Sequence, residues 1–186
     1  MKVSLIKWIT EDDWLGIKQR ALVTVGKKAV THPGDDWKSK ILAARHSPIR
    51  YGMFSFFIED VPYCISVHLV RHHEGFQPYV RSQRNDRQSE YDRNAARQDA
   101  PVNMILDINA EAMMTIANKR LCAKADPTTR ALVQAMCEAV IAKNPEFAPY
   151  LVPNCEYHGK VCYEMLPCGR NKPYMSAKVS RNEEIS

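Results

Sequence analysis

The sequence lacks any apolar run that approaches the length needed to span a membrane. It also lacks internal repeats and low-complexity segments, and its first ten residues are amphipathic and too short for a signal peptide. We therefore expect a cytoplasmic protein that does not enter the membrane. The 186 residues, 45% of them hydrophobic and 25% charged, have the length and composition of one ordinary globular domain with a sizeable core.

The sequence has six cysteines, which a reducing cytoplasm would keep free or metal-bound instead of paired in disulfides. Three of them, Cys155, Cys162 and Cys168, lie within fourteen residues of one another near the C-terminus. Cysteine is a zinc ligand, although this spacing is not that of a standard zinc knuckle. Cys122 or His158 could supply a fourth ligand. A zinc site and a loop of reduced cysteines both fit the pattern, and we treat residues 153–186 as a separate cysteine-rich tail.

Hydrophobic periodicity and capping residues predict strands and helices ahead of this tail. The expected strands cover residues 2–9 and 52–58, and the expected helices cover about 11–26, 35–45, 62–72, 103–122 and 127–143. Thr10 with Asp13 resembles a capping box, and Asp126 followed by Pro127 is typical of a helix start. Between Gly75 and Pro101 the sequence is polar and shows no sustained periodicity.

The net charge of +5 is modest, but arginines and histidines crowd the stretch between residues 68 and 97. The guanidinium group presents a rigid fork of donors that matches a phosphate group, so this clustering favours a phosphorylated ligand. Acidic residues lie among the arginines, and a solvated surface of salt bridges explains the stretch equally well. Charge alone leaves both readings open.

Two short motifs within this stretch carry the chemistry. Arg71-His72-His73 follows the helix predicted over 62–72, and Ser82-Gln83-Arg84 follows after an eight-residue spacer. This arrangement resembles the flavin-dependent thymidylate synthases, whose hallmark is Arg-His-Arg, a seven-residue spacer and Ser, often followed by Gln-Arg. Other segments similar to the family stand in the same order along residues 1–150: His46-Ser47-Pro48, Phe54-Ser55-Phe56, Asp60-Val61-Pro62, Ala96-Arg97, Asn109-Ala110 and Lys119-Arg120.

The resemblance implies an α+β fold over residues 1–152, with a mixed sheet flanked by helices. It further implies a homotetramer whose active sites are shared between subunits. The implied reaction is the reductive methylation of dUMP to dTMP, with FAD as cofactor, methylenetetrahydrofolate as carbon donor and NADPH as reductant. Because the mechanism favoured for this route needs no enzyme nucleophile, the protein's part would be to orient the ligands and stabilise charge.

The resemblance also assigns residues to two groups of contacts. One group would bind the flavin: Arg71, His72, His73 and Asn109. The other would bind the nucleotide, with Ser82 and Arg120 closest to the chemistry: Ser82, Gln83, Arg84, Arg97 and Arg120.

Several positions depart from the family pattern. His73 stands in place of an arginine and keeps a donor without the permanent charge or the bidentate fork. Tyr51 stands in place of a histidine, and His68 in place of a glutamine. Glu111 replaces an arginine that helps to bind the flavin phosphate, where a carboxylate is repulsive. These exchanges leave open a reaction on a related pyrimidine nucleotide, such as hydroxymethylation.

A hypothesis from another class is a non-catalytic, zinc-containing module that binds nucleic acid. Its basis is the arginine-rich stretch with the interleaved aromatics Phe76 and Tyr79, together with the cysteine-rich tail. The order of the motifs along the chain favours the enzyme over this module.

Overall fold

The structure is a computed structural model that describes residues 1–174 except 73, 83, 85, 87–91 and 93. The first half of the chain forms β1 (Lys2–Lys7), α1 (Glu11–Val23), α2 (Asp35–Ala43), the 3-10 helix η1 (Ser47–Tyr51), β2 (Met53–Pro62), α3 (Tyr63–Leu69) and β3 (Phe76–Val80). The second half forms β4 (Pro101–Asn109), α4 (Ala110–Arg120), α5 (Pro127–Lys143), the 3-10 helix η2 (Pro145–Phe147), α6 (Asn154–Tyr157), β5 (Val161–Cys162) and β6 (Lys172–Pro173).

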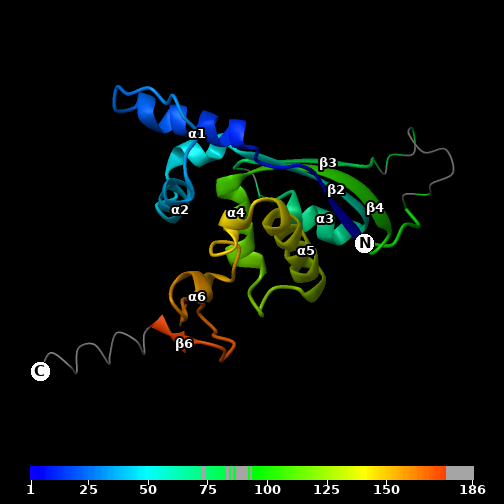
Figure 1. The fold of residues 1–186 in the computed structure, drawn as a ribbon. Helices are drawn as coiled ribbons and strands as arrows, with labels where there is room; N and C mark the ends of the chain where they lie inside the picture. The colour runs from blue at the N-terminus through cyan, green and yellow to red at the C-terminus, as the bar shows by residue number, and fades with distance from the viewer. Residues whose placement is uncertain (73, 83, 85, 87–91, 93, 175–186) are drawn as a thin grey trace, which may run out of the picture.

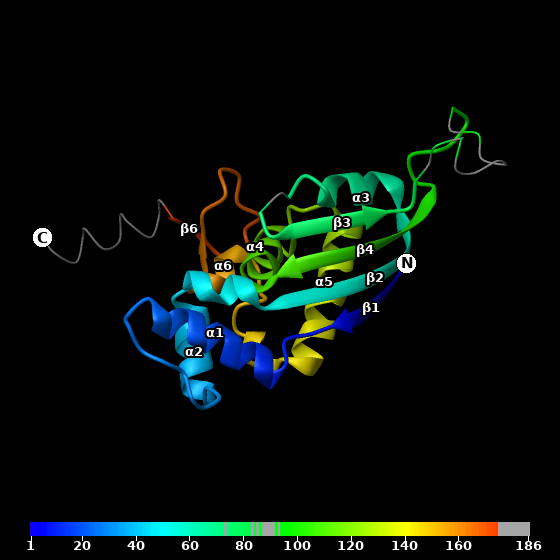
Figure 2. The same cartoon turned by 90° about the horizontal axis from the view of Figure 1, so that it is seen from above.

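A four-stranded sheet with the order β1-β2-β4-β3 is the centre of the fold. Its three pairings are all antiparallel, and the parallel pairing among the described residues joins the short strands β5 and β6. Helices α3, α4 and α5 lie on one face of the four-stranded sheet, as both views show (Figures 1 and 2). The predicted α+β class, with helices flanking the strands, is therefore confirmed.

The core lies between this sheet and its helices because alternate residues of β2 and β4 point the same way. Phe54, Phe56 and Ile58 of β2 are fully buried, and so is the matching set of β4: Val102, Met104, Leu106 and Ile108. Period-two burial of this kind is what an antiparallel sheet with one covered face requires.

The helix predicted from about residue 103 is wrong in its first third. Residues 101–109 form β4, and helix begins only at Ala110. The alternation of Val102, Met104, Leu106 and Ile108 indicates a strand. The prediction was wrong because Ile105 and Ile108 also fit the i, i+3 spacing of a helix. The short strand β3 was also missed, because Pro78 and the exposed Gln77 and Tyr79 make it look like loop.

The N-terminal caps of α1 and α5 are the ones that the sequence predicts. Thr10 and Asp13 form the expected capping box of α1. The Asp126 carboxylate accepts a hydrogen bond from the Thr129 amide at 2.8 Å and caps α5. The start of α2 differs, because Gly34 and not Asp35 is its N-cap.

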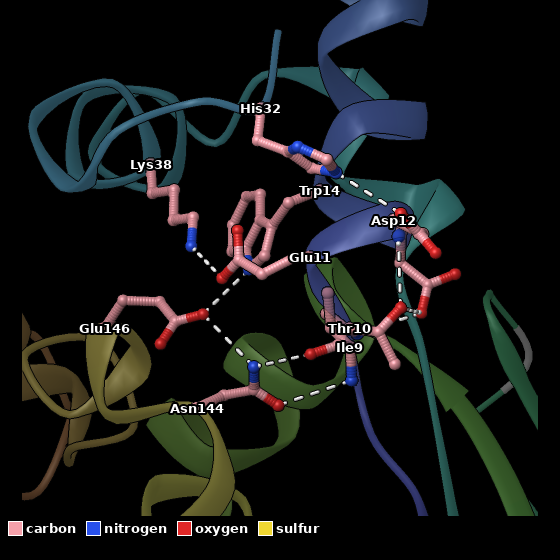
Figure 3. A network of polar contacts seen from close by, with 10 residues as sticks. Ile9, Thr10, Glu11, Asp12, Trp14, His32, Lys38, Asn144 and Glu146 are labelled. Atoms are coloured by element: carbon pink, nitrogen blue, oxygen red, sulfur yellow. Dashed lines mark hydrogen bonds and ion pairs between the residues drawn. The ribbon is translucent and has the colours of Figure 1, made fainter.

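A polar network fastens α1 to the end of α5 (Figure 3). The Asn144 side chain donates to the Ile9 carbonyl at 2.8 Å, and the Ile9 amide donates back to the Asn144 Oδ1 at 3.3 Å. The Trp14 indole donates to Glu146 at 2.8 Å, and the buried Lys38 ammonium pairs with Glu11. Buried polar groups that are fully paired in this way fix one arrangement of the elements.

Residues 153–174 form a small C-terminal module, which lies beyond α4 on the side away from the four-stranded sheet (Figure 1). The Asn118 side chain of α4 donates to the Tyr150 and Val152 carbonyls at 3.1 and 2.8 Å, just before the module begins. Among the residues with a described position, no helix is both long and apolar enough to cross a membrane.

Candidate active site

A cavity of about 790 Å³ opens where α3 ends, β3 begins and β4 passes into α4. This volume lies in the range of pockets that hold cofactors and small ligands. The lining combines cationic side chains and two carboxylates with nearly as much apolar surface as polar surface: Arg50, Arg71, His72, Glu74, Gly75, Phe76, Asn109, Glu111, Ala112, Thr115 and Lys119. Three of the residues assigned to the flavin, Arg71, His72 and Asn109, are among them.

Arg71 and His72 stand on the turn that ends α3. The His72 amide donates to the Leu69 carbonyl at 3.0 Å, and the imidazole lies 5.8 Å from the Phe76 ring at the start of β3. A terminal guanidinium nitrogen of Arg120 lies 3.3 Å from the His72 Nε2. Since arginine can only donate, Nε2 accepts this bond, which places the imidazole proton on Nδ1.

Arg120 connects this turn to the last residue of α4. Its Nε is buried and has no hydrogen-bond partner among the described residues. A buried guanidinium donor without a partner is uncommon, because desolvating it costs free energy that a hydrogen bond normally offsets. Arg120 itself is not part of the cavity lining and reaches the cavity through its contact with His72.

Asn109 and Gly75 meet at the floor of the cavity. The Asn109 side-chain oxygen accepts from the Ala112 amide at 2.8 Å and caps α4, while its backbone amide donates to the Gly75 carbonyl at 2.9 Å. Gly75 has a φ of +67°, and a Cβ there would lie 2.1 Å from the Asn109 Nδ2. Glycine is therefore required both by backbone conformation and by close approach.

Glu111 is paired on its far side with Arg45. The Arg45 Nε donates to the Glu111 Oε1 at 3.0 Å, and the same guanidinium reaches the Thr115 hydroxyl at 2.7 Å. The second carboxylate oxygen, Oε2, is buried and has no partner within the described part of the chain. The pairing offsets the charge of Glu111, so the net charge of the cavity wall is set by Arg50, Arg71 and Lys119 against the carboxylate of Glu74.

The residues assigned to the nucleotide, other than Arg120, lie elsewhere. Ser82, Arg84 and Arg97 belong to the connection between β3 and β4, which leaves the sheet at the end opposite to the cavity (Figure 2). At about 3.3 Å per residue, the length of β3 alone separates the two places by more than about 13 Å. Within one chain, the structure does not bring the two predicted groups together. His73 and Gln83 lie outside the described residues.

Both of these loop arginines are held by neighbouring carboxylates. Arg84 makes two hydrogen bonds to Asp86, at 2.9 and 2.8 Å, and Arg97 makes two to Asp99, both at 2.9 Å. The hydrogen bond from Arg97 holds the pKa of Asp99 below its ordinary value, and the same bond raises the pKa of Arg97. All four side chains are exposed, so a phosphate could replace either carboxylate at little cost.

The predicted zinc ligands do not form a ready metal site. No three His, Cys, Asp or Glu side chains in the described residues are placed to hold a metal ion. A second, much smaller cavity is nevertheless lined by all four of the predicted cysteine ligands: Cys122, Cys155, Cys162 and Cys168. His158, considered as an alternative ligand, is not part of that lining and packs between the rings of Tyr157 and Tyr163.

Sequence reasoning missed several residues of the large cavity. Arg50 stands on η1 and Lys119 on α4, and neither belongs to a motif, so only the fold reveals them. Arg45 was missed as the partner of Glu111 because 66 residues separate the two in sequence. Tyr51, noted for its unusual identity, lies under the Arg20 guanidinium, 3.4 Å from the ring centroid, and not in the cavity lining.

No protein-family model and no curated protein matches the chain. Solved structures do match. Thymidylate synthase X from Helicobacter pylori, solved with FAD and dUMP, has a TM-score of 0.65 and 15% identity, with 85% of this chain and 100% of the other covered. A flavin-dependent thymidylate synthase from the same organism, also complexed with FAD and dUMP, has a TM-score of 0.64 and 15% identity, with 83% and 99% covered. The chain thus has the fold of the flavin-dependent thymidylate synthases.

Proposed function

We propose that the chain is a flavin-dependent enzyme that methylates dUMP to dTMP, with methylenetetrahydrofolate as carbon donor and NADPH as reductant. The observation that carries the proposal is the large cationic cavity. It gathers Arg71, His72 and Asn109, the residues that the sequence resemblance assigned to the flavin, in a fold whose solved relatives were crystallised with FAD and dUMP. Neither a basic surface nor a nucleic-acid module requires a cavity of this size.

The residues of the cavity fit a flavin dinucleotide. Arg50, Arg71 and Lys119 supply positive charge for its phosphates. Glu74 and Glu111 are the misfits for a phosphate, and the pairing of Glu111 with Arg45 reduces the repulsion from one of them. The unpartnered Glu111 Oε2 can instead accept from a hydroxyl or an imino group of the ligand. When bound, the flavin supplies the hydride.

The residues of this chain would bind and orient the flavin and the nucleotide, and they would exclude water from the site. The contact with Arg120 holds the imidazole of His72 in a defined orientation. Asn109 holds the start of α4 against Gly75, and this contact sets the shape of the cavity floor. Preorganised groups of this kind lower the cost of reaching the transition state without taking part covalently.

The loop that carries Ser82, Arg84 and Arg97 would complete the site of a neighbouring chain. The distance between this loop and the cavity within one chain supports an oligomer in which each active site takes its cavity from one subunit and its nucleotide loop from another. We propose a homotetramer built in this way. In it, Ser82 would face the pyrimidine, and Arg84 would exchange Asp86 for the nucleotide phosphate.

The direct test is product analysis with purified chain, FAD, NADPH, methylenetetrahydrofolate and dUMP labelled with tritium at C5. Methylation releases the label to water and yields dTMP, which mass spectrometry identifies. If the label is released but the product is a hydroxymethylated nucleotide, the chain catalyses hydroxymethylation instead of methylation. Absence of any dUMP-dependent label release from folded protein that has bound FAD would refute the proposal.

A further inference from the structure

Cys122 and three cysteines of the C-terminal module line one small cavity between α4 and that module. Cys122 follows the end of α4, Cys155 is on α6, Cys162 is on β5, and Cys168 lies on the loop before β6. All four are free thiols, and Cys162 is buried. The two remaining cysteines, Cys64 and Cys137, belong to the packing of the main core and not to this cavity.

The cavity has the size of one ion. Its volume is about 20 Å³, close to the space that a single water-sized sphere needs. Four cysteines that line a space for one sphere supply the ligand types of a structural zinc site, which is tetrahedral with Zn–S distances of about 2.3 Å. Disulfides would need the thiols in two bonded pairs and would leave no central space.

The module has little aliphatic core, and its packing rests mainly on ring contacts among Tyr157, His158, Tyr163 and Tyr174. Its elements are a four-residue helix and two strands of two residues each. Its largest aliphatic side chains point outward, with Met165 97% exposed and Leu166 75% exposed. Segments of this size normally need a disulfide framework or a metal to be stable.

The backbone around the cysteines is built of turns. Gly159 and Lys160 adopt positive φ values between Cys155 and Cys162, and Gly169 does so directly after Cys168. These turns bring the segments back towards Cys122, and no Cβ at Gly159 or Gly169 would meet a neighbouring atom. Arg170 and Glu164 also line the cavity, and Arg170 is paired with Glu156 at 3.5 Å.

We propose that Cys122, Cys155, Cys162 and Cys168 bind one Zn²⁺, which closes the module onto the end of α4. As the side chains stand, they are not yet close enough to hold an ion. Binding therefore draws in the loop of Cys168, the exposed member of the set. Cys122 is two residues beyond Arg120, so the ion would also fix the helix end from which Arg120 contacts His72.

The test is the metal content of the full-length chain, purified without chelators and with a thiol reductant. We expect about one zinc per chain, and after replacement by Co²⁺ the charge-transfer and ligand-field absorption typical of a tetrahedral thiolate site. Cys155→Ser and Cys162→Ser should each reduce the bound zinc at least tenfold, whereas the matched control Cys64→Ser should keep it.

Measurements on the unmodified chain keep the test decisive if a variant fails to fold. Titration of the native thiols with a mercurial should release the zinc in proportion to the cysteines blocked. A reduced chain that contains no zinc and takes up neither Zn²⁺ nor Co²⁺ would overturn the proposal. So would disulfides among the four cysteines, mapped by mass spectrometry, if reducing them restores no metal uptake.

Discussion

At the scale of single residues, the cavity depends on the contact between Gly75 and Asn109. Gly75 adopts a left-handed conformation, and the side-chain amide of Asn109 occupies the position that a Cβ of residue 75 would take. The same Asn109 side chain caps α4. One position thus couples the turn after Arg71-His72 to the helix that carries Glu111, Lys119 and Arg120.

We expect Gly75→Ala to destabilise the chain by about 2 kcal/mol or more. The left-handed backbone alone costs an alanine about 1–2 kcal/mol, and displacing Asn109 from its capping position adds about 1 kcal/mol. Gly26→Ala is the matched control, since Gly26 has a φ of +69° with no atom near its would-be Cβ. Urea unfolding of both variants measures the difference. Equal losses would mean that the Asn109 contact contributes nothing.

At the residue scale, the structure brings some of the predicted flavin-binding residues into one cavity. Arg71, His72 and Asn109 were assigned from short motifs and share one cavity, because an ordered set of motifs carries more information than any one of them. Arg50 and the Arg45–Glu111 pair could not be found in this way. Their partners come from elements that only the packed fold brings together.

At the scale of elements, capping and burial patterns decide what the sequence reveals. Helix α5 was predicted with its correct ends because Asp126, Pro127 and Asn144-Pro145 mark both of them locally. Strand β4 was hidden, since it runs without a break into α4 and its alternating residues also fit a helical period in part. Only pairing with β2 and β3 settles that segment as a strand.

The cap of α5 gives a pH-dependent prediction. The hydrogen bond from the Thr129 amide holds the pKa of Asp126 below its ordinary value of 3.8. A lowered carboxyl pKa in the folded state stabilises the fold above the ordinary value, and this stability is lost as pH falls through the lowered pKa. Asp126→Ala should therefore cost about 1 kcal/mol at neutral pH, and the difference from the unmodified chain should shrink in acid.

Asp126→Asn separates the charge from the hydrogen bond. Asparagine is an equally good cap, so this variant should keep most of the stability at neutral pH and show a flatter decline in acid. Chemical unfolding across the acidic range measures both effects. An Asp126→Ala deficit that is the same at neutral and acidic pH would contradict the assigned role of the ionised carboxylate.

At the scale of the whole molecule, the structure divides the predicted site into two places. The cavity lies at one end of the sheet and the loop of Ser82, Arg84 and Arg97 at the other. The sequence could not reveal this separation, because the two motifs are neighbours along the chain. Strand β3 stands between them and carries the second motif away from the first.

Mixing two inactive variants tests whether active sites are shared between subunits. In oligomers assembled at random from Arg71→Ala and Arg84→Ala chains, about one quarter of the sites would combine an intact cavity with an intact loop. Co-expression and purification by two different tags should therefore restore about one quarter of the dUMP-dependent activity. Arg84→Ala mixed with Arg97→Ala is the control, since every loop is then damaged and no activity should return. Equal inactivity of both mixtures, with co-assembly demonstrated, would refute shared sites.

The central claim of the account is that the cavity of Arg71 and His72 binds a flavin, and equilibrium titration with FAD tests it most directly. We predict saturable binding of one FAD per chain, followed by the quenching of flavin fluorescence. Binding should weaken at least tenfold in Arg71→Ala and stay unchanged in Lys28→Ala, which alters a lysine outside the cavity lining. Folded, unmodified chain that binds no FAD, or an Arg71→Ala variant that binds it as tightly, would contradict the claim.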